Sequence, residues 1–412
     1  MPRDVTDYLR GPEVDLSEMI WQMPPAYHQR REEDNTITFF RSGQPKGEEN
    51  FALRLTIKNG HITKVIQGPA LSDEDLEQIH NKIEQNLLQL TGDHFHRGVL
   101  FSSTPIQGSW RYKDKFQILP PPPESPMPGP GHDFGFARYP FVLELKYSGS
   151  ANFKINMMRG TKTTEELSYL FSSLLEGSIY GLGQRPRSHW VLLPERRSFW
   201  QRLFAKTRRW DVGFCNEFYT LGDMGKIHKF SSNDHLPPLP FEESKKYYLE
   251  RCDSLNSDGL KLPENFEESL DRFFSLPIEK RESYLRAGYY FQRSSMIFDY
   301  SSSISYIALI QAVEAIMPSI SSSEVCETCK STLRKGPTSL FAEFLESLLG
   351  NSSDAHRHLK VFYSVRSALS HGGKILHLDR VGGGGVLSMG ELARFINLRR
   401  IVRLALVKWL YE

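Results

Sequence analysis

An arginine and a histidine near the C-terminal end of the chain offer the most specific chemistry in the sequence. Arg366 and His371 stand in the segment DAHRHLKVFYSVRSALSH, with four residues between them. A guanidinium binds phosphate or carboxylate oxygens through directed hydrogen bonds, and an imidazole exchanges protons near neutral pH. These residue types could therefore hold an anionic group and move a proton at it.

The position of Arg366 is unusual for a charged residue. At about 100° per residue it falls in the middle of an arc of about 120° occupied by apolar and aromatic residues, namely Leu359, Phe362, Tyr363 and Leu369. Burial of an unpaired charge would cost several kcal/mol, so Arg366 needs a carboxylate partner, a polar cleft or a subunit interface. Glu314 is the only acidic residue in the apolar segment SISYIALIQAVEAIM. A purely structural pair of Arg366 with Glu314 is therefore the alternative to a functional site.

His371 is followed by Gly372 and Gly373, which suit the left-handed conformation that ends a helix. On an ideal helix, Arg366 and His371 point about 140° apart and lie about 7.5 Å apart along the axis. One regular helix does not easily aim both side chains at the same atom. Either the backbone leaves the helix at His371, or two copies of the motif meet across a two-fold axis and form a composite site.

The segment YSVRSALSHGG, with Ser367 directly after the arginine, resembles the signature of HEPN domains, particularly of their Apea-like branch. The preceding YLRAGYYFQRSSMIFDYSSSISYIALIQAVEAIM is similar to the paired helices of that group and includes the acidic Glu314. CETCKSTLRKGPTSLFAEFLESL resembles the cysteine pair and Gly-Pro-Thr segment of some members. The resemblance spans about residues 278–379 and does not extend to the N-terminal half.

The resemblance implies metal-independent RNA cleavage without a cofactor, usually in toxin, antiphage or RNA-processing settings and commonly by a dimer. It assigns proton transfer from the ribose 2′-hydroxyl to His371 and phosphate binding to Arg366. Ser367 would supply a hydrogen bond, and Glu314 would be the acidic member of the site. Many HEPN-like domains are noncatalytic, so the alternative is a dimerisation or interaction protein in which Arg366 is simply paired with Glu314.

These residues lie in a region that is predicted to be helical throughout. After Pro263 the amphipathic segments begin at about residues 264, 278, 303, 338, 354 and 389, and the glycine-rich RVGGGGVLS separates the last two. Short connections between amphipathic helices predict an antiparallel bundle over residues 264–412.

The N-terminal half is predicted to be mixed α/β and to contain two similar strand-strand-helix-strand units. The first has alternating apolar residues from Phe51, an Asn59-Gly60 turn and a helix capped by Ser72. The second has the same alternation from Phe141, a Ser-Gly-Ser turn and a helix capped by Thr163. Duplication would explain the similar spacing, and chance similarity is the alternative. The proline-rich segment from Leu119 connects the units, which gives predicted domains at 1–118, 131–240 and 264–412.

A basic segment with interleaved aromatic residues lies between Gln184 and Trp210. Phosphate attraction and base stacking would suit single-stranded RNA, whereas an amphipathic helix with a solvated basic face is the alternative. The candidate RNA-binding residues are Arg185, Arg187, Arg196, Arg197, Arg202, Lys206, Arg208 and Arg209.

Two further patterns admit a metal but favour a structural interpretation. Cys326 and Cys329 have the spacing of half a zinc site, which His356 and His358 could complete. A structural thiol pair is favoured over bound zinc, and redox chemistry is the third alternative. Glu144 and Lys146, with Asp133 upstream, are reminiscent of magnesium-dependent nucleases. Strand alternation instead places Glu144 and Lys146 on a solvent face. No resident metal is expected.

Length and composition limit the number of domains and the classes of protein to which the chain could belong. A chain of 412 residues predicts two or three domains, and 39% hydrophobic with 24% charged residues is typical of a soluble folded protein. A formal net charge of +2 is too small for a global attraction to nucleic acid, so RNA binding must be regional. The sequence shows no secretory signal or membrane-spanning run, and its cysteines form no disulfide framework. A cytoplasmic location with RNA and a second copy as partners is expected.

Overall fold

The computed structural model divides the chain into two compact units. Unit 1 comprises Met1–His94 and Lys146–Gly160, and unit 2 comprises Phe95–Leu145 and Thr161–Glu412. The structure describes all residues except 1, 12–14, 28, 34, 44, 48, 59–60, 89, 124, 126–138, 151, 176–178, 182–188, 195–209, 216–226, 251–258, 299, 319–322, 326–331, 335, 351–352 and 382–385.

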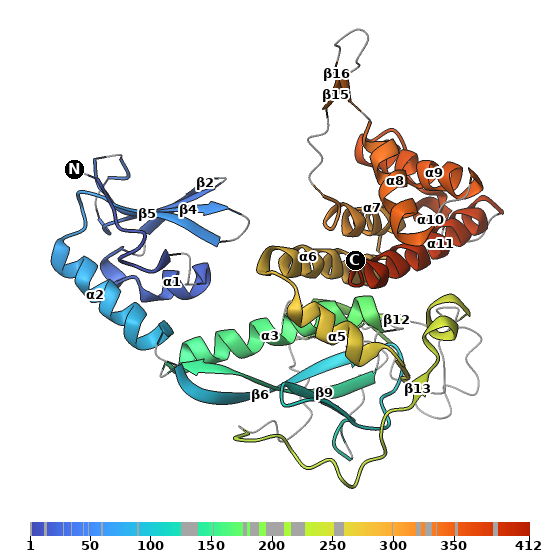
Figure 1. The fold of residues 1–412 in the computed structure, drawn as a ribbon, viewed down its shortest axis with the longest axis horizontal. Coiled ribbons are helices and arrows are strands. Elements are labelled where there is room, and N and C mark those ends of the chain that lie inside the picture. The colour runs from blue at the N-terminus through green and yellow to red at the C-terminus, as the bar shows by residue number, and fades with distance from the viewer. Residues whose placement is uncertain are drawn as a thin grey trace. The chain divides into compact units, whose positions relative to one another are not determined.

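Unit 1 contains a five-stranded antiparallel sheet in the order β1-β5-β4-β3-β2 (Figure 1). The strands are β1 (Arg3–Asp4), β2 (Gln29–Glu33), β3 (Thr36–Phe40), β4 (Phe51–Lys58) and β5 (His61–Gln67). Leu55 on β4 is paired with Val65 on β5, and both side chains are buried. The hairpin predicted from the alternation after Phe51 is therefore confirmed, although its two turn residues lie outside the described residues.

Helices complete the core of unit 1. They are α1 (Leu16–Gln22), η2 (Pro25–Tyr27), α2 (Asp73–Ile83) and η3 (Glu84–Leu88). The Ser72 side chain accepts a hydrogen bond from the Asp75 amide, as predicted for the start of α2. Leu76 and Ile79 of α2 are buried with the sheet residues, and Ile155 from the second stretch of the unit joins the same core.

Unit 2 contains a second five-stranded sheet in the order β10-β6-β9-β8-β7. Its strands are β6 (Leu90–Ser102), β7 (Trp110–Tyr112), β8 (Phe116–Leu119), β9 (Tyr139–Ser150) and β10 (Ile179–Gly181). The helix α3 (Phe153–Leu174) packs on this sheet, and the ring of its Phe171 lies 5.4 Å from that of Phe116. Three elements, β6, β9 and α3, cross from one unit into the other.

The second strand-strand-helix-strand unit does not form as predicted. Strand β9 continues through the expected turn to Ser150, and α3 begins at Phe153, well before Thr163. Asn152 is the reason, because its side chain accepts from the Lys154 amide and its carbonyl accepts from the Asn156 amide, which starts the helix early. The predicted boundary at residue 118 also passes through β8, a strand that is paired with β9.

The described part of unit 2 also contains small two-stranded pairs that are separate from its five-stranded sheet. The predicted strand HWVLLP forms β11 (His189–Pro194), which pairs with β12 (Trp210–Cys215) rather than with the five-stranded sheet. The parallel pair of β13 (Phe241–Glu242) and β14 (Leu262–Pro263) flanks η5 (Lys246–Glu250). A further hairpin consists of β15 (Ser323–Val325) and β16 (Thr332–Arg334).

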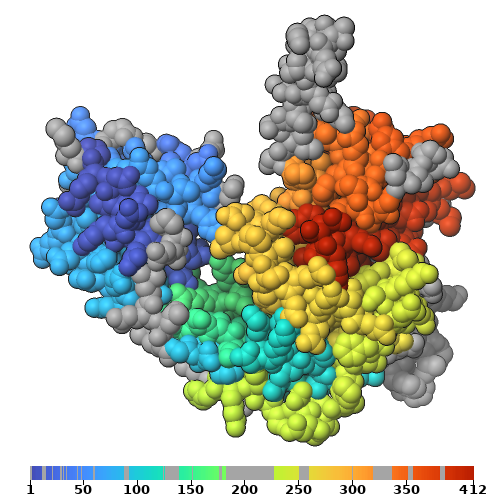
Figure 2. All heavy atoms as spheres, in the orientation of Figure 1, coloured from blue at the N-terminus to red at the C-terminus, as the bar shows by residue number. Residues whose placement is uncertain are grey.

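The C-terminal part of unit 2 is helical, as predicted. Its helices are α5 (Phe266–Ser275), α6 (Ile278–Ile297), α7 (Ser302–Glu314), α8 (Pro337–Leu349), α9 (Ser353–Ser370), α10 (His377–Val381) and α11 (Val386–Trp409). The short α10 was not expected, and the β15–β16 hairpin between α7 and α8 departs from the prediction of helices alone after Pro263. The last turns of α11, red in Figure 2, lie against α6, where the rings of Tyr284 and Trp409 stack at 5.9 Å.

The helical part packs on the second sheet through α3 and α6. The buried Gln292 amide donates to the carbonyl of Ile179, over 2.5 Å, and to the hydroxyl of Ser168. The hydroxyls of Ser173 and Tyr284 are also hydrogen-bonded, at 3.1 Å. Contacts of this kind explain why the helical region and the sheet form one unit.

Candidate functional site

Helix α9 carries the predicted site residues and ends as the sequence indicated. The amide of Gly373 donates to the carbonyl of Ala368, and the amide of Gly372 donates to that of Leu369. Gly372 has a φ of +70°, so the two bonds form a Schellman motif in which glycine takes the left-handed position. His371 is the residue just before this position, and its own amide still donates to the Ser367 carbonyl at 3.1 Å.

Arg366 is held against Glu314 at the end of α7. Its Nη2 donates to Oε2 of Glu314 at 3.1 Å, and the two side chains keep 24% and 29% of their exposure. The Nε atom of Arg366 is buried and has no hydrogen-bond partner among the described residues. The predicted pairing of Arg366 with Glu314 is therefore present, but the guanidinium is not sealed from solvent.

Tyr363 is a member of this cluster that the sequence indicated only as a core residue. Its hydroxyl donates to Oε1 of Glu314 at 2.9 Å, and its ring lies below the guanidinium of Arg366 at 5.4 Å. Burial and the hydrogen bond to Glu314 raise the pKa of the Tyr363 hydroxyl. The spacing of three residues between Tyr363 and Arg366 on one helix face could have indicated this contact.

His371 lies at the exposed end of α9, and no hydrogen bond joins its imidazole to Arg366 among the described residues. Its amide still donates as in a helix, and on an ideal helix its side chain would point about 140° away from that of Arg366. Among the described residues, the imidazole has no hydrogen-bond partner. Helix α9 itself ends at Ser370, and His371 stands in the turn that follows, as the C-cap residue of the Schellman motif. Ser367 is half-buried beside Arg366.

The loop after His371 is fixed to the start of α7. The Asp379 carboxylate accepts hydrogen bonds from the amides of Ser302, at 2.5 Å, and Ser303, at 3.0 Å, and so caps that helix. Burial raises the pKa of the Asp379 carboxyl, but these hydrogen bonds outweigh burial and leave the pKa below its ordinary value. The amide of Leu376 also donates to the Ser303 hydroxyl. Helix α7 therefore positions Arg366 at one end and the segment after His371 at the other.

Glu144 does not occupy a solvent face, contrary to the strand alternation. Its side chain is fully buried and accepts hydrogen bonds from Arg97, Gln117 and both the amide and hydroxyl of Ser231. Burial raises the pKa of the carboxyl, but these donors outweigh burial and hold it below its ordinary value. Strand β9 is central, and the segment containing Ser231 covers the face that a strand at the surface would leave in water. With both oxygens occupied, Glu144 is not arranged as a metal ligand.

Several predicted residues cannot be placed. All eight candidate RNA-binding residues between Arg185 and Arg209 lie outside the described residues, as do Asp133, Cys326 and Cys329. His356, a candidate zinc ligand, is paired with Glu346 at 2.8 Å. Within the described part of the chain, no group of three or more histidine, cysteine or acidic side chains is arranged to hold a metal ion.

Comparison of the chain with protein-family models, curated proteins and solved structures gave no match. Within the described ranges, every helix is too short or too polar to cross a membrane.

Proposed function

We propose that the helical part of unit 2 is a HEPN-type endoribonuclease that cleaves RNA without a metal ion. The remainder of the chain would sense a trigger or position the RNA, as in a toxin or an antiphage effector. The observation that carries the proposal is the state of Arg366. Its guanidinium is oriented by Glu314 and Tyr363, yet it keeps 24% exposure and one unsatisfied donor, one and a half turns before an exposed histidine.

The chemistry follows from the two side chains. The neutral imidazole of His371 takes the proton from the ribose 2′-hydroxyl, whose oxygen attacks the adjacent phosphorus. The bond from phosphorus to the 5′-oxygen breaks, and this oxygen takes up a proton from water. The products are a 2′,3′-cyclic phosphate and a 5′-hydroxyl end. The guanidinium of Arg366 stabilises the charge that develops on the phosphoryl oxygens, and Ser367 adds a hydrogen bond.

A composite site across a two-fold axis reconciles this chemistry with the geometry. Because ideal helix geometry would point Arg366 and His371 apart, a phosphate would be bound by Arg366 of one copy near His371 of the other. Apolar side chains available for such a contact stand at the start of α7, after the end of α9 and at the start of α11. They are Ile304, Ile375, Val386, Leu387 and Met389, each more than half exposed. Exposed apolar surface commonly marks protein–protein contacts where it is contiguous.

A second candidate is a noncatalytic HEPN-like dimerisation protein. The observation that favours it is the hydrogen-bonded ion pair of Arg366 with Glu314, which already gives the arginine a partner of opposite charge. In a noncatalytic protein, the imidazole of His371 would not take part in catalysis.

The two candidates differ in their effect on RNA. Purified full-length protein would be incubated with total cellular RNA in excess EDTA, and new 5′-hydroxyl ends would be mapped. Cleavage that survives EDTA and is lost in His371→Ala and in Arg366→Ala supports the ribonuclease. His358→Ala is the matched control, because His358 is an exposed histidine on another face of the same helix.

An enzyme that is inactive until it meets its trigger would also leave RNA intact in the test with purified protein, so a second test in cells is required. Growth arrest on overexpression of the wild type, with loss of toxicity in Arg366→Ala at equal protein level, would support the ribonuclease. Intact RNA at high protein concentration, together with wild-type growth and a dimer in solution, would favour the noncatalytic protein.

A further inference from the structure

The solvent side of α9 carries a stripe of polar and basic side chains that ends at His371. Measured from His371 at 100° per residue, the stripe members fall within an arc of about 80°. They follow one another at alternating spacings of three and four residues and are Arg357, Lys360, Ser364, Ser367 and His371. Each is exposed or half-buried, and none belongs to the buried face of the helix.

Within the described part of the chain, no acidic side chain is paired with the cations of this stripe. Neither Arg357 nor Lys360 forms an ion pair among the residues that the structure describes. The basic residues of α9 that point toward neighbouring helices differ in this respect, because His356 is paired with Glu346 and Arg366 with Glu314. Positive charge is thus left available on the one side of α9 that also presents the imidazole.

The composition of the stripe indicates what it would bind. Apart from His371 it contains two cations and two hydroxyls and no phenylalanine, tyrosine or tryptophan, so it is better suited to contact phosphates and sugars than to stack on bases. From Arg357 to His371 the stripe is about 21 Å long at 1.5 Å per residue. That length matches about six stacked nucleotides at about 3.4 Å each, or fewer in an extended strand.

We propose that Arg357 and Lys360 hold the phosphate backbone of the RNA strand that leads to His371, so that the strand runs along α9. This proposal rests on the proposed function and specifies how that site receives its substrate. Lys360 and Arg357 lie about 16 Å and about 21 Å from His371 along the helix axis. They would therefore contact phosphates several nucleotides away from the cleaved bond, without reading the base sequence.

The test measures binding separately from cleavage. A fluorescent 2′-O-methyl oligonucleotide of mixed sequence, which has no free 2′-hydroxyl to attack the phosphorus, would be titrated with full-length protein at several salt concentrations. In the double variant Arg357→Glu and Lys360→Glu, affinity should fall by about tenfold or more. The slope of log K against log salt should decrease by about 1.4, because each lost phosphate contact on a single strand contributes about 0.7.

Two matched variants complete the experiment. Arg286→Glu with Lys245→Glu makes the same change in net charge at exposed positions of the same unit and should bind like the wild type. Arg357→Lys with Lys360→Arg keeps both charges and should retain binding. Equal loss in the Arg286 and Lys245 variant, an unchanged salt slope in the α9 variant, or no RNA binding by the wild type would each overturn the proposal.

These experiments distinguish failure of the proposed RNA path along α9 from failure of the proposed ribonuclease function. If His371→Ala abolishes cleavage but the α9 double variant binds and cleaves normally, the ribonuclease stands and the path along α9 is wrong. If the α9 variant loses binding but no protein cleaves RNA, the surface binds RNA and the ribonuclease fails.

Discussion

The guanidinium of Arg366 on α9 donates a hydrogen bond over 3.1 Å to the carboxylate of Glu314 on α7. Both side chains keep about a quarter of their exposure, 24% and 29%, so water screens the attraction. A pair of this kind contributes about 1 kcal/mol or less to the free energy of unfolding. The arrangement therefore orients the arginine more than it stabilises the fold.

Glu314→Gln should show whether Glu314 mainly orients Arg366 or mainly stabilises the fold. The free energy of unfolding should change by less than about 1 kcal/mol. Under the proposed ribonuclease function, RNA cleavage should fall by about ten- to a hundredfold, mainly in kcat, because Arg366 is no longer held in position. Single-turnover cleavage and chemical denaturation would measure the two effects. Glu346→Gln removes the partner of His356 instead and should leave cleavage unchanged. A large loss of stability with normal cleavage would contradict the assignment of Glu314 as a positioning residue.

The buried carboxylate of Glu144 should be much more important for stability. Every group that faces it is a donor, from Arg97, Gln117 and Ser231, so the amide of Glu144→Gln would place a donor against donors. The free energy of unfolding of Glu144→Gln should be lower than that of the wild type by about 3 kcal/mol. Glu268→Gln, which breaks an exposed pair with Arg272, should cost about 0.5 kcal/mol or less. Thermal unfolding of both variants tests the difference, and similar midpoints would contradict it.

The lowered pKa of Glu144 also sets the sign of a pH effect. A carboxyl whose pKa is lower in the folded state stabilises the fold above its unfolded pKa, and this contribution is lost as the pH falls through the folded value. The stability of the wild type should therefore decrease below about pH 4.3, the ordinary value for glutamate. Glu144→Gln should show a shallower decrease over the same range. Equal slopes for wild type and variant would contradict the prediction.

Local patterns in the sequence predicted the elements whose signals lie within a few residues. The Ser72 cap, the alternation after Phe51 and the glycine pair after His371 each specify backbone conformation by themselves. The arginine on the apolar side of α9 also identified its partner, because Glu314 is the only acidic residue in its segment. These features depend on capping, side-chain periodicity and the cost of burying charge.

The features that were predicted wrongly depend on distant parts of the chain or on competing local signals. Alternation along β9 could not show that Ser231, far away in the sequence, covers Glu144. The predicted Ser148–Ser150 turn does not form, because Asn152 caps the start of α3 directly after the strand. The contact of Tyr363 with Glu314 was missed because an apolar stripe was read only as core.

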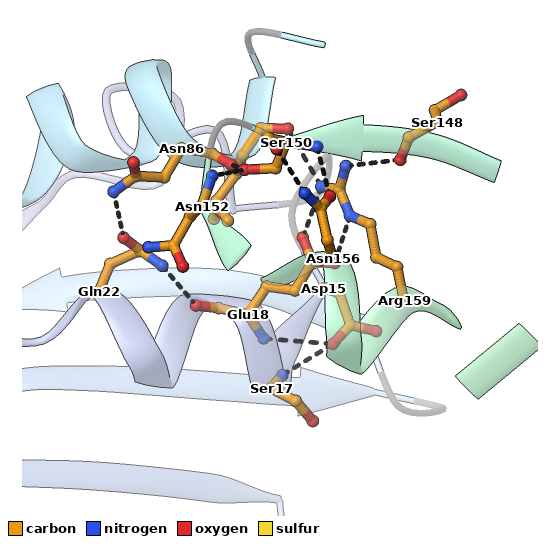
Figure 3. Close-up of polar contacts among 11 residues, drawn as sticks. Asp15, Ser17, Glu18, Gln22, Asn86, Ser148, Ser150, Asn152, Asn156 and Arg159 are labelled. Carbon is orange, nitrogen blue, oxygen red and sulfur yellow. Dashed lines mark hydrogen bonds and ion pairs between the residues drawn. The ribbon is translucent and has the colours of Figure 1, made fainter. Parts of the chain in front are cut away.

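The pair of Glu18 and Arg159 should control how residues Lys146–Gly160 are held in unit 1. Arg159 on α3 donates to both oxygens of Glu18 on α1, at 2.7 and 2.8 Å, and to the carbonyls of Leu87 and Ser148 (Figure 3). Glu18 keeps only 8% exposure, so Arg159→Ala would leave a nearly buried carboxylate without its partner. The free energy of local unfolding of this region should fall by about 3 kcal/mol.

Hydrogen exchange measures this effect locally. Backbone amides of residues Lys146–Gly160 should exchange faster in Arg159→Ala, and Arg159→Lys should be intermediate because lysine cannot bind both oxygens in the same geometry. Lys58→Ala, an exposed change at the end of β4, is the control in the same unit. Unchanged exchange in Arg159→Ala would show that the pair does not hold this segment.

Two helical glycines should respond in opposite directions to the same substitution. A Cβ at Gly288 on α6 would lie 2.8 Å from the carbonyl oxygen of Tyr169 on α3, closer than real contacts allow, whereas a Cβ at Gly390 on α11 would meet nothing within 4 Å. Alanine is favoured over glycine inside a helix by about 1 kcal/mol. Gly390→Ala should therefore stabilise by up to that amount. At Gly288 the forced separation of two packed helices costs about 1–3 kcal/mol, which exceeds the gain in propensity. Gly288→Ala should lower the thermal midpoint, and a rise in both variants would show that α3 and α6 are not packed this closely.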